Sequence, residues 1–427
     1  MRTRTAVGPN AVITITLLAL LTSALPALAA EGNSDQIVRF ATFNASLNRA
    51  VQGELIADLS ATTDTQAQNV AEIIQRTRPD VLLINEFDYD EDEVAIDLFQ
   101  DNYLSVSQNG ANAIEYPYRM GFPSNTGIVA GFDLNKDGVT SQSGDIGTAA
   151  YANDSWGFGF FPGQFGFAVY SMYPIDVEGI RTFQHFLWQD MPDALLPVDP
   201  ANGQSYYSAE ILAEFRLSSK NHVDVPIEVG QKTVHFLISH PTPPVFDGPE
   251  DRNGTRNHDE IRFWADYVSP GHHSSYIHDD AGGTGGLEPG SMFVIAGDQN
   301  SDPFDGDSVA GSAQLLLEHP LVNTKTTPGS QGGVDRSAAQ AGNETHIGDP
   351  ANDTADFSEP PFGPGNLRAD YVLPSKSLQI RDAGVFWPAD SDPLTRLTGT
   401  GLFGDRVPSS DHRLVWVDVS HGAFPRD

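Results

Sequence analysis

Apolar runs that end in polar side chains recur along this chain, and the clearest one lies at residues 293–303. Its sequence, F-V-I-A-G-D-Q-N-S-D-P, passes from apolar residues through a glycine to Asp298 and Asn300. A continuous apolar run is typical of a strand buried on both faces. Residues two apart share a side of an extended chain, so Asp298 and Asn300 are predicted to point at one centre. Ligands of layered α/β folds bind at such strand ends.

The same pattern predicts an α/β opening near the N-terminus. Residues 37–43 read as a strand that precedes Asn44, and residues 80–84 read as a strand that precedes Glu86. Between them, residues 66–77 carry apolar side chains at helical spacing and end just before a proline. Strand, helix and strand in this order indicate an α/β fold.

The rest of the chain alternates short predicted elements with long polar loops. Strands are predicted at residues 166–173, 208–217, 232–239, 366–374 and 414–419, the second and third of them forming a hairpin. Helices are predicted at residues 257–267 and 313–318, and long loops at residues 102–162, 271–290 and 326–365. His272, His273 and His278 lie in the second loop, where we expect solvated side chains, with a metal cluster as the alternative.

The first thirty residues have the pattern of a secretory signal peptide. Arg2 and Arg4 precede an apolar run at residues 11–21, and an A-x-A pattern ends at Ala29. We expect residues 1–29 to be removed near Ala29/Ala30, which would make the protein secreted or periplasmic in a bacterium. An uncleaved anchor is the alternative, but the apolar run is short for a membrane span. The chain has no cysteine, which excludes a lipoprotein anchor and disulfide bonds.

The net charge changes the range of partners to be considered. The chain carries 57 acidic against 24 basic residues, a formal net charge of -33. Such a surface repels polyanions and argues against a protein that grips DNA without sequence preference. The simpler interpretation is solubility outside the cell.

One polar stretch resembles the first half of a calcium-binding loop. Asp133, Asn135 and Asp137 form a D-x-N-x-D-G run, whereas the position of the closing acid holds Gly144, with Asp145 one residue later. A structural Ca²⁺ site near these residues and a solvated turn rich in Asp and Asn both stay open, and the turn is favoured.

The side chains that could bind a metal or take part in catalysis lie at the ends of the predicted strands. The side chains there are Asn44, Glu86, His240, Asp298, Asn300, Asp370, Asp411 and His412. Carboxylate and amide oxygens suit Mg²⁺, Mn²⁺ or Ca²⁺ better than a soft metal. A hard cation with a histidine and an acid pair suits phosphoryl chemistry. Taken singly, each residue could equally cap a strand or complete a buried hydrogen bond.

Six short segments resemble, in the same order, motifs of the endonuclease/exonuclease/phosphatase superfamily, the fold of DNase I-like nucleases, inositol polyphosphate phosphatases and bacterial sphingomyelinases. They are T-F-N (Asn44), P-D-V-L-L-I-N-E (Glu86), S-H-P-T (His240), G-D-Q-N-S-D-P (Asp298, Asn300), R-A-D-Y-V-L-P (Asp370) and S-S-D-H (Asp411, His412). The resemblance implies an α/β (α+β) fold, a four-layered sandwich of two mixed sheets packed face to face with helices outside. Residues 30–427 would form one catalytic domain of this kind.

The resemblance also implies a role for each of these side chains. Metal ligands would be Asn44, Glu86 and Asp411, holding Mg²⁺ or Mn²⁺. Catalytic residues would be His240, Asp298, Asn300, Asp370 and His412. Asp298 would position or deprotonate the attacking water, and Asn300 would hold that water or a phosphate oxygen. His412, oriented by Asp370, would contact the scissile phosphate or the leaving group, with His240 as a phosphate contact on the opposite side.

The expected function is a secreted, metal-dependent phosphoesterase in which water attacks a phosphodiester or phosphomonoester in line. The alternatives are an extracellular nuclease acting on DNA or RNA and a non-catalytic binding protein that retains the fold. A serine hydrolase is disfavoured because the chain has no G-x-S-x-G motif. We expect a monomer without a stable membrane anchor, whose partner is its phosphoester substrate and which meets nucleic acid only as a substrate.

Three further groups bear on the substrate. A nuclease would need basic residues near the site, for which Arg49, Arg252, Arg256 and Arg262 are the sparse candidates. Attack on a lipid would need exposed aromatics, for which Phe160, Phe161 and Phe165 are available, although core packing is favoured for them. Thr242, Arg252, Asn257 and His258 either shape the substrate pocket or brace the loop after His240.

Overall fold

A computed structural model describes residues 36–358, 363–399, 407–422 and 424 of the 427-residue chain. The predicted signal peptide at residues 1–29 lies outside these ranges. Within them, the helices are all too short or too polar to cross a membrane.

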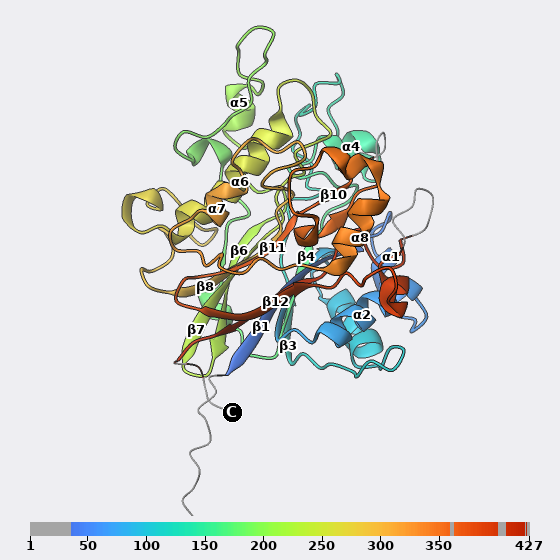
Figure 1. The fold of residues 1–427 in the computed structure, drawn as a ribbon. Helices are drawn as coiled ribbons and strands as arrows, with labels where there is room; N and C mark the ends of the chain where they lie inside the picture. Colours follow the sequence, from blue (N-terminus) through green and yellow to red (C-terminus); the bar gives the residue numbers. More distant parts are fainter. Residues whose placement is uncertain (1–35, 359–362, 400–406, 423, 425–427) are drawn as a thin grey trace, which may run out of the picture. The chain divides into compact units, whose positions relative to one another are not determined.

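Two mixed sheets form the centre of the described chain (Figure 1). The six-stranded sheet has the order β12 (Gln379–Val385), β13 (Val415–Ser420), β1 (Ile37–Leu47), β2 (Val81–Phe87), β4 (Phe167–Ser171) and β3 (Tyr118–Gly121). The five-stranded sheet has the order β11 (Asp370–Pro374), β8 (Met292–Asp298), β7 (Lys232–Ser239), β6 (His222–Val229) and β5 (Arg181–Thr182). The pairs β1–β2 and β7–β8 are parallel and the other neighbours are antiparallel.

The two sheets pack face to face through one apolar core. Phe40 of β1 meets Phe236 of β7 with ring centroids 5.5 Å apart. Val81, Ile238 and Val294 belong to the same cluster of buried side chains, drawn from both sheets. Burying apolar area on this scale is the main favourable contribution to folding. The sheets therefore form the two inner layers of the fold.

Helices cover the outer face of each sheet (Figure 1). The six-stranded sheet is covered by α1 (Glu54–Leu59), α2 (Thr65–Thr77) and α3 (Val94–Phe99), and the five-stranded sheet by α6 (Arg252–Val268) and α7 (Gln314–Leu317). The other helices are α4 (Ala149–Asn153), α5 (Ala209–Leu212) and α8 (Gln331–Ala339), and a small ribbon pairs β9 (Ala355–Asp356) with β10 (Asn366–Leu367). The predicted four-layered sandwich is confirmed.

Helix α2 shows why the local sequence folds as predicted. The Asp64 side chain caps its N-terminus by accepting a hydrogen bond from the backbone N–H of Ala67. The helix ends at Thr77, and the capping residue Arg78 has left-handed backbone angles directly before a proline. Its apolar stripe, which includes Val70 and Ile74, is fully buried against the six-stranded sheet.

Four predicted elements are wrong. The predicted loop at residues 102–162 contains the strand β3 and the short helix α4. Residues 208–217 are not a strand, because Ser208 caps the short helix α5 with its hydroxyl, and the hairpin partner of β7 is β6. The predicted loop at residues 326–365 contains α8 and β9. The predicted strand at residues 366–374 is divided into β10 and β11, which belong to different sheets.

Candidate active site

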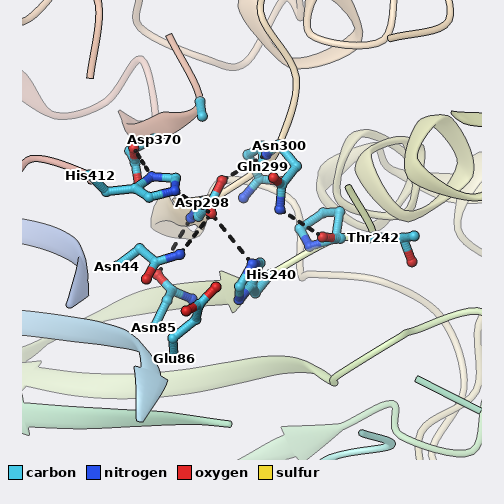
Figure 2. A network of polar contacts seen from close by, with 12 residues as sticks. Asn44, Asn85, Glu86, His240, Thr242, Asp298, Gln299, Asn300, Asp370 and His412 are labelled. Atoms are coloured by element: carbon cyan, nitrogen blue, oxygen red, sulfur yellow. Dashed lines mark hydrogen bonds and ion pairs between the residues drawn. The ribbon is translucent and has the colours of Figure 1, made fainter. Parts of the chain in front are cut away.

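Seven of the eight predicted site residues meet at one end of the sandwich (Figure 2), and the eighth, Asp411, directly precedes His412. Asn44 lies within β1, Glu86 lies near the end of β2, and Asp298 is the last residue of β8. His240 directly follows β7, and Asp370 is the first residue of β11. The remaining three, Asn300, Asp411 and His412, lie in loops.

Asp298 is the centre of this arrangement and is 1% exposed. Its Oδ2 accepts a hydrogen bond of 3.0 Å from Asn44 Nδ2 and lies 3.4 Å from His240 Nε2 and 3.6 Å from His412 Nε2. Its Oδ1 accepts the backbone N–H of Asn300 at 2.9 Å. Side chains of three other predicted residues thus converge on one carboxylate oxygen.

The surroundings of Asp298 favour its protonated form. Burial, together with the nearby Asp370 carboxylate, raises the pKa of Asp298 to about 6, while His412 and the hydrogen bond from Asn44 act in the opposite direction. A carboxylate with a pKa near neutrality can take up a proton and release it again during turnover.

His412 and Asp370 form a buried pair. His412 Nδ1 lies 2.9 Å from Asp370 Oδ2, which also accepts a hydrogen bond of 2.8 Å from Thr354 Oγ1. Burial opposes the charged ring, but the carboxylates of Asp370 and Asp298 raise the pKa of His412 well above its usual value. The pair presents Nε2 of the ring to Asp298, because Nδ1 is occupied by Asp370.

His240 lies on the other side of Asp298 from His412 (Figure 2). The ring is 3% exposed, and its Nδ1 has no hydrogen-bond partner among the described residues. Burial, with the positive charges of Lys220 and His412, lowers the pKa of His240 well below its usual value. The two histidines of the site therefore have opposite protonation preferences.

Glu86, Asn44 and Asp411 form the part of the site that suits a metal. Asn44 Oδ1 accepts the backbone N–H of Ser46 at 3.2 Å, and the Ser46 hydroxyl lies 3.3 Å from Asp411 Oδ1. Glu86 has a left-handed φ of 56° inside β2, and its Oε2 accepts a hydrogen bond of 2.8 Å from Asn48. Such strain occurs at functional sites.

The charges of this group fit a hard cation. Burial and the neighbouring carboxylates of Asp411 and Asp298 raise the pKa of Glu86, while His412 and Asn44 act in the opposite direction. No lysine or arginine in the described ranges forms an ion pair with Glu86 or Asp411. A divalent cation between these oxygens would supply the missing positive charge.

A second group with metal-ligand atoms is formed by Asp298, Asp370 and His412, whose candidate atoms lie within 4.8 Å of one another. His412 Nδ1 and Asp370 Oδ2 are already engaged with each other at 2.9 Å. This geometry is that of a histidine held between two carboxylates.

Asn300 differs from the prediction made for it. Its φ is 51°, so the backbone at residues 298–300 is not extended and the two side chains do not share a side in the way predicted. The Asn300 amide instead donates to the backbone oxygen of Pro241 at 3.1 Å. It still lies beside His240 at the edge of the site (Figure 2).

Asn85 follows the predicted strand together with Glu86, but the sequence analysis left it out of the predicted site, in which it is buried. Its Oδ1 accepts hydrogen bonds from Thr42 Oγ1 at 3.0 Å and from the backbone N–H of Asp298 at 3.4 Å, and its Nδ2 donates to the backbone oxygen of Ser239 at 3.5 Å. It therefore joins the two sheets directly beneath the site. A polar residue inside the apolar run before Glu86 was the available signal.

Helix α6 braces the loops on the His240 side. Asn257 Nδ2 donates to the backbone oxygens of Thr242 and Gln299, at 2.8 and 2.9 Å. Glu260 accepts the backbone N–H groups of Ser219 and Thr242, both at 2.6 Å. Of the two roles open for Asn257, its contacts are those of a brace.

The remaining candidate metal residues lie in exposed loops. The Asp133 carboxylate accepts the backbone N–H groups of Asp137 and Gly138, at 3.1 and 2.9 Å, which is the hydrogen bonding of a solvated turn. The rings of His272 and His273 stack against each other at 4.0 Å, and His278 Nε2 lies 4.0 Å from an Asp190 oxygen.

The predicted aromatic candidates are divided between the core and the surface. Phe161 is 3% exposed and packs inside the protein. Phe160 and Phe165 are half-buried, and both rings contact Phe158, which is 52% exposed.

Comparison with known proteins places the chain by its sequence. The family model described as "Endonuclease/Exonuclease/phosphatase family" matches residues 41–412. No curated protein matches the chain. Among solved structures, an endonuclease/exonuclease/phosphatase from Beutenbergia cavernae is 17% identical, with 91% of this chain and 73% of that chain covered and a TM-score of 0.46. The chain is also similar to beta toxin from Staphylococcus aureus, at 15% identity, with 90% of this chain and 99% of that chain covered and a TM-score of 0.42. It is similar as well to truncated TDP2 from Caenorhabditis elegans, at 13% identity, with 90% of this chain and 98% of that chain covered and a TM-score of 0.41.

Proposed function

Since the chain belongs to the endonuclease/exonuclease/phosphatase family, whose model matches residues 41–412, we propose that it is a metal-dependent phosphoric ester hydrolase. The observation that carries the proposal is the convergence of Asn44, His240 and His412 on one oxygen of Asp298. A non-catalytic binding protein would have no need of a buried carboxylate poised near neutrality beside an oriented histidine.

The reaction proposed for these residues is in-line attack of water on phosphorus. Asp298, held through Oδ1 by the backbone N–H of Asn300, takes the proton of the water as the new oxygen–phosphorus bond forms. His412, held by Asp370 at 2.9 Å, contacts the phosphoryl group and donates its Nε2 proton to the departing ester oxygen as that bond breaks. His240, buried and neutral, contacts the phosphoryl group from the opposite side.

Glu86, Asn44 and Asp411 are the residues that would hold the cation, for which Mg²⁺ or Mn²⁺ is proposed because the donor atoms are all oxygens. When bound, a divalent cation neutralises charge on the non-bridging oxygens of the phosphoryl group.

A small phosphodiester or phosphomonoester is proposed as the substrate rather than duplex nucleic acid. Arg49, Arg252 and Arg262 are each paired with a carboxylate of the protein. Arg256 is buried, and its guanidinium donates to backbone oxygens. These arginines are therefore engaged within the protein, and the net charge of -33 opposes a polyanion. Secretion is proposed from the N-terminal sequence pattern alone.

A screen of phosphoesters tests the proposal. The purified mature protein is incubated with Mg²⁺ or Mn²⁺ and with plasmid DNA, RNA, sphingomyelin, phytate and sugar phosphates, each against an EDTA control. Hydrolysis of a small ester that EDTA abolishes is the expected result. Hydrolysis of plasmid DNA in preference to every small ester would contradict the substrate class. The absence of metal-dependent hydrolysis of all of them would contradict the enzyme itself.

A further inference from the structure

Lys220 is a buried cation without a partner. The residue is 7% exposed. Across the described ranges no carboxylate oxygen lies within 4.0 Å of its ammonium, which donates no hydrogen bond. Arg413, another buried cation, donates through Nη1 to the backbone oxygens of Ser410 and His412 at 2.7 and 3.0 Å. Because the residue is buried, its ammonium has little contact with water, and an unpaired ammonium there is available to a partner that arrives from outside the chain.

The backbone on both sides of Lys220 is fixed beside the active site. The pairing of β6 with β7 sets His222 opposite Ser239, so Lys220 and His240 emerge at the same end of the hairpin. Ser219 Oγ donates to the backbone oxygen of His240 at 3.4 Å. Glu260 holds the loops of both residues through one carboxylate. Lys220 is therefore held in place by the same brace as His240.

The ammonium lies within the electrostatic reach of the site. Burial lowers the pKa of Lys220, and the carboxylates of Glu260, Glu86 and Asp298 oppose this by favouring the charged form. In turn, Lys220 is one of the charges that lower the pKa of His240. His240 Nδ1 also lacks a hydrogen-bond partner in the described part of the chain. Lys220 and His240, which are held by the same brace, thus each have a nitrogen without a partner in the described ranges.

We propose that Lys220 is a further substrate-binding residue whose ammonium binds a non-bridging oxygen of the phosphoryl group on the His240 side of the site. Lysine binds phosphate as a point charge. Lys220 gives a strongly acidic protein a positive charge next to His240, while the arginines considered above are already engaged. The proposal rests on the proposed phosphoesterase function. The competing interpretation is that Lys220 only balances the buried charge of Glu260.

Binding of inorganic phosphate in the presence of Mg²⁺, measured by calorimetry, separates the two interpretations. Lys220→Met removes the charge and keeps the length of the side chain. Lys232→Met is the matched control, because Lys232 is exposed at the other end of the same hairpin. We expect Lys220→Met to weaken phosphate binding at least tenfold, Lys220→Arg to recover part of the loss, and Lys232→Met to remain within about twofold of wild type.

Magnesium binding in the absence of phosphate supplies the second readout. It should be unchanged or tighter in Lys220→Met, because the variant removes a positive charge and no oxygen ligand. Wild-type phosphate affinity in a folded Lys220→Met protein, or no phosphate binding by the wild type, overturns the proposal. If Lys220→Met fails to fold, NMR of ¹⁵N-lysine-labelled wild type replaces it, with the Nζ signal of Lys220 assigned by comparison with Lys220→Arg. The proposal predicts that this signal shifts when phosphate is added. An unmoved signal also overturns the proposal.

The experiments distinguish an incorrect role for Lys220 from an incorrect phosphoesterase function. A wild-type protein that binds phosphate through Lys220 but hydrolyses no ester supports the binding role and contradicts the enzyme. A wild-type protein that hydrolyses esters while Lys220→Met binds phosphate normally supports the enzyme and contradicts the binding role.

Discussion

At the scale of single residues, identical side chains acquire different properties from their surroundings. His240 and His412 both approach Oδ2 of Asp298. His412 has a carboxylate behind it and its pKa is raised, whereas His240 is buried beside Lys220 and its pKa is lowered. Because these shifts depend on neighbours that are distant in sequence, residue type alone could not assign the two roles.

The pH dependence of turnover tests the role of Asp298. Its pKa is raised to about 6, and only the ionised carboxylate can accept a proton from water. Below this pKa, the ionised fraction falls tenfold for each pH unit, so kcat should fall by the same factor between about pH 5 and pH 4 and level off above pH 7. Buffers of constant ionic strength and a saturating metal concentration are required. A kcat that is flat between pH 4.5 and 7 would contradict Asp298 as the base.

Asp370→Asn tests the orientation of His412. The variant keeps the volume of the side chain but removes the charge that faces Nδ1 at 2.9 Å. We expect kcat to fall by about 10- to 100-fold, as for other residues that orient a functional histidine. The pKa of His412, followed by NMR of its ring protons, should move to lower pH, because a carboxylate that raises it has gone. An unmoved His412 titration would show that Asp370 has another role.

At the scale of elements, periodicity predicted the strands that are buried on both faces and the helices with a clear apolar stripe. It failed where tertiary contacts decide. Strand β6 was missed because its face opposite the core between the sheets carries the polar His222 and Asp224, which hydrogen-bond to the backbone oxygen of Glu260 and to the ring of His235. The exposed edge strand β12 was missed because most of its side chains face solvent.

Gly297→Ala tests the close approach of β7 and β8. Gly297 has a φ of 143°, and an added Cβ would lie 2.0 Å from the backbone oxygen of Ser239. Because neither strand can move without disturbing the β7–β8 pairing, we expect a loss of roughly 3 kcal/mol or more in the free energy of unfolding. Urea denaturation measures it. Gly144→Ala, at a position with nothing within 4 Å, is the control, and equal stabilities of the two variants would contradict the expectation.

His222→Gln tests the buried histidine of β6. Burial lowers the pKa of His222 to about 4, below the value of about 6.5 expected in the unfolded chain. The folded protein therefore favours the neutral ring. Its contribution to the free energy of unfolding is fully present above pH 6.5, and it is lost at lower pH because the unfolded chain takes up a proton more readily than the folded one. Between pH 7.5 and 5, wild type should lose roughly 2 kcal/mol more unfolding free energy than His222→Gln. Equal losses of unfolding free energy in wild type and His222→Gln would contradict this expectation.

At the scale of the whole molecule, the order of six motifs carried most of the prediction. The four-layered sandwich and the family followed from that order, because each motif lies at the end of a strand and the fold brings those ends together. The sequence could not predict the contacts of Asn85 and Lys220 or the brace from Glu260, since these contacts are made only when the two sheets and α6 are packed. It also could not predict the left-handed backbone of Asn300.

The negative charge of the whole molecule affects how the site can bind an anionic substrate. A chain with a net charge of -33 repels an anionic substrate, and its site adds the carboxylates of Glu86, Asp298, Asp370 and Asp411. A bound cation, the protonated His412 and Lys220 would provide the compensating positive charge. The affinity for substrate should therefore depend strongly on metal concentration and on salt.

The most direct test of the central claim is the hydrolysis of bis(p-nitrophenyl) phosphate by wild type and Asp298→Asn, measured side by side. Asp101→Asn, an exposed carboxylate, serves as the matched control. We predict that wild type and the control hydrolyse the ester with Mg²⁺ or Mn²⁺, lose activity in EDTA and regain it when metal is restored. Asp298→Asn should be slower by two decades or more while remaining folded by circular dichroism. Undiminished turnover in Asp298→Asn, or hydrolysis that EDTA does not affect, would contradict the account.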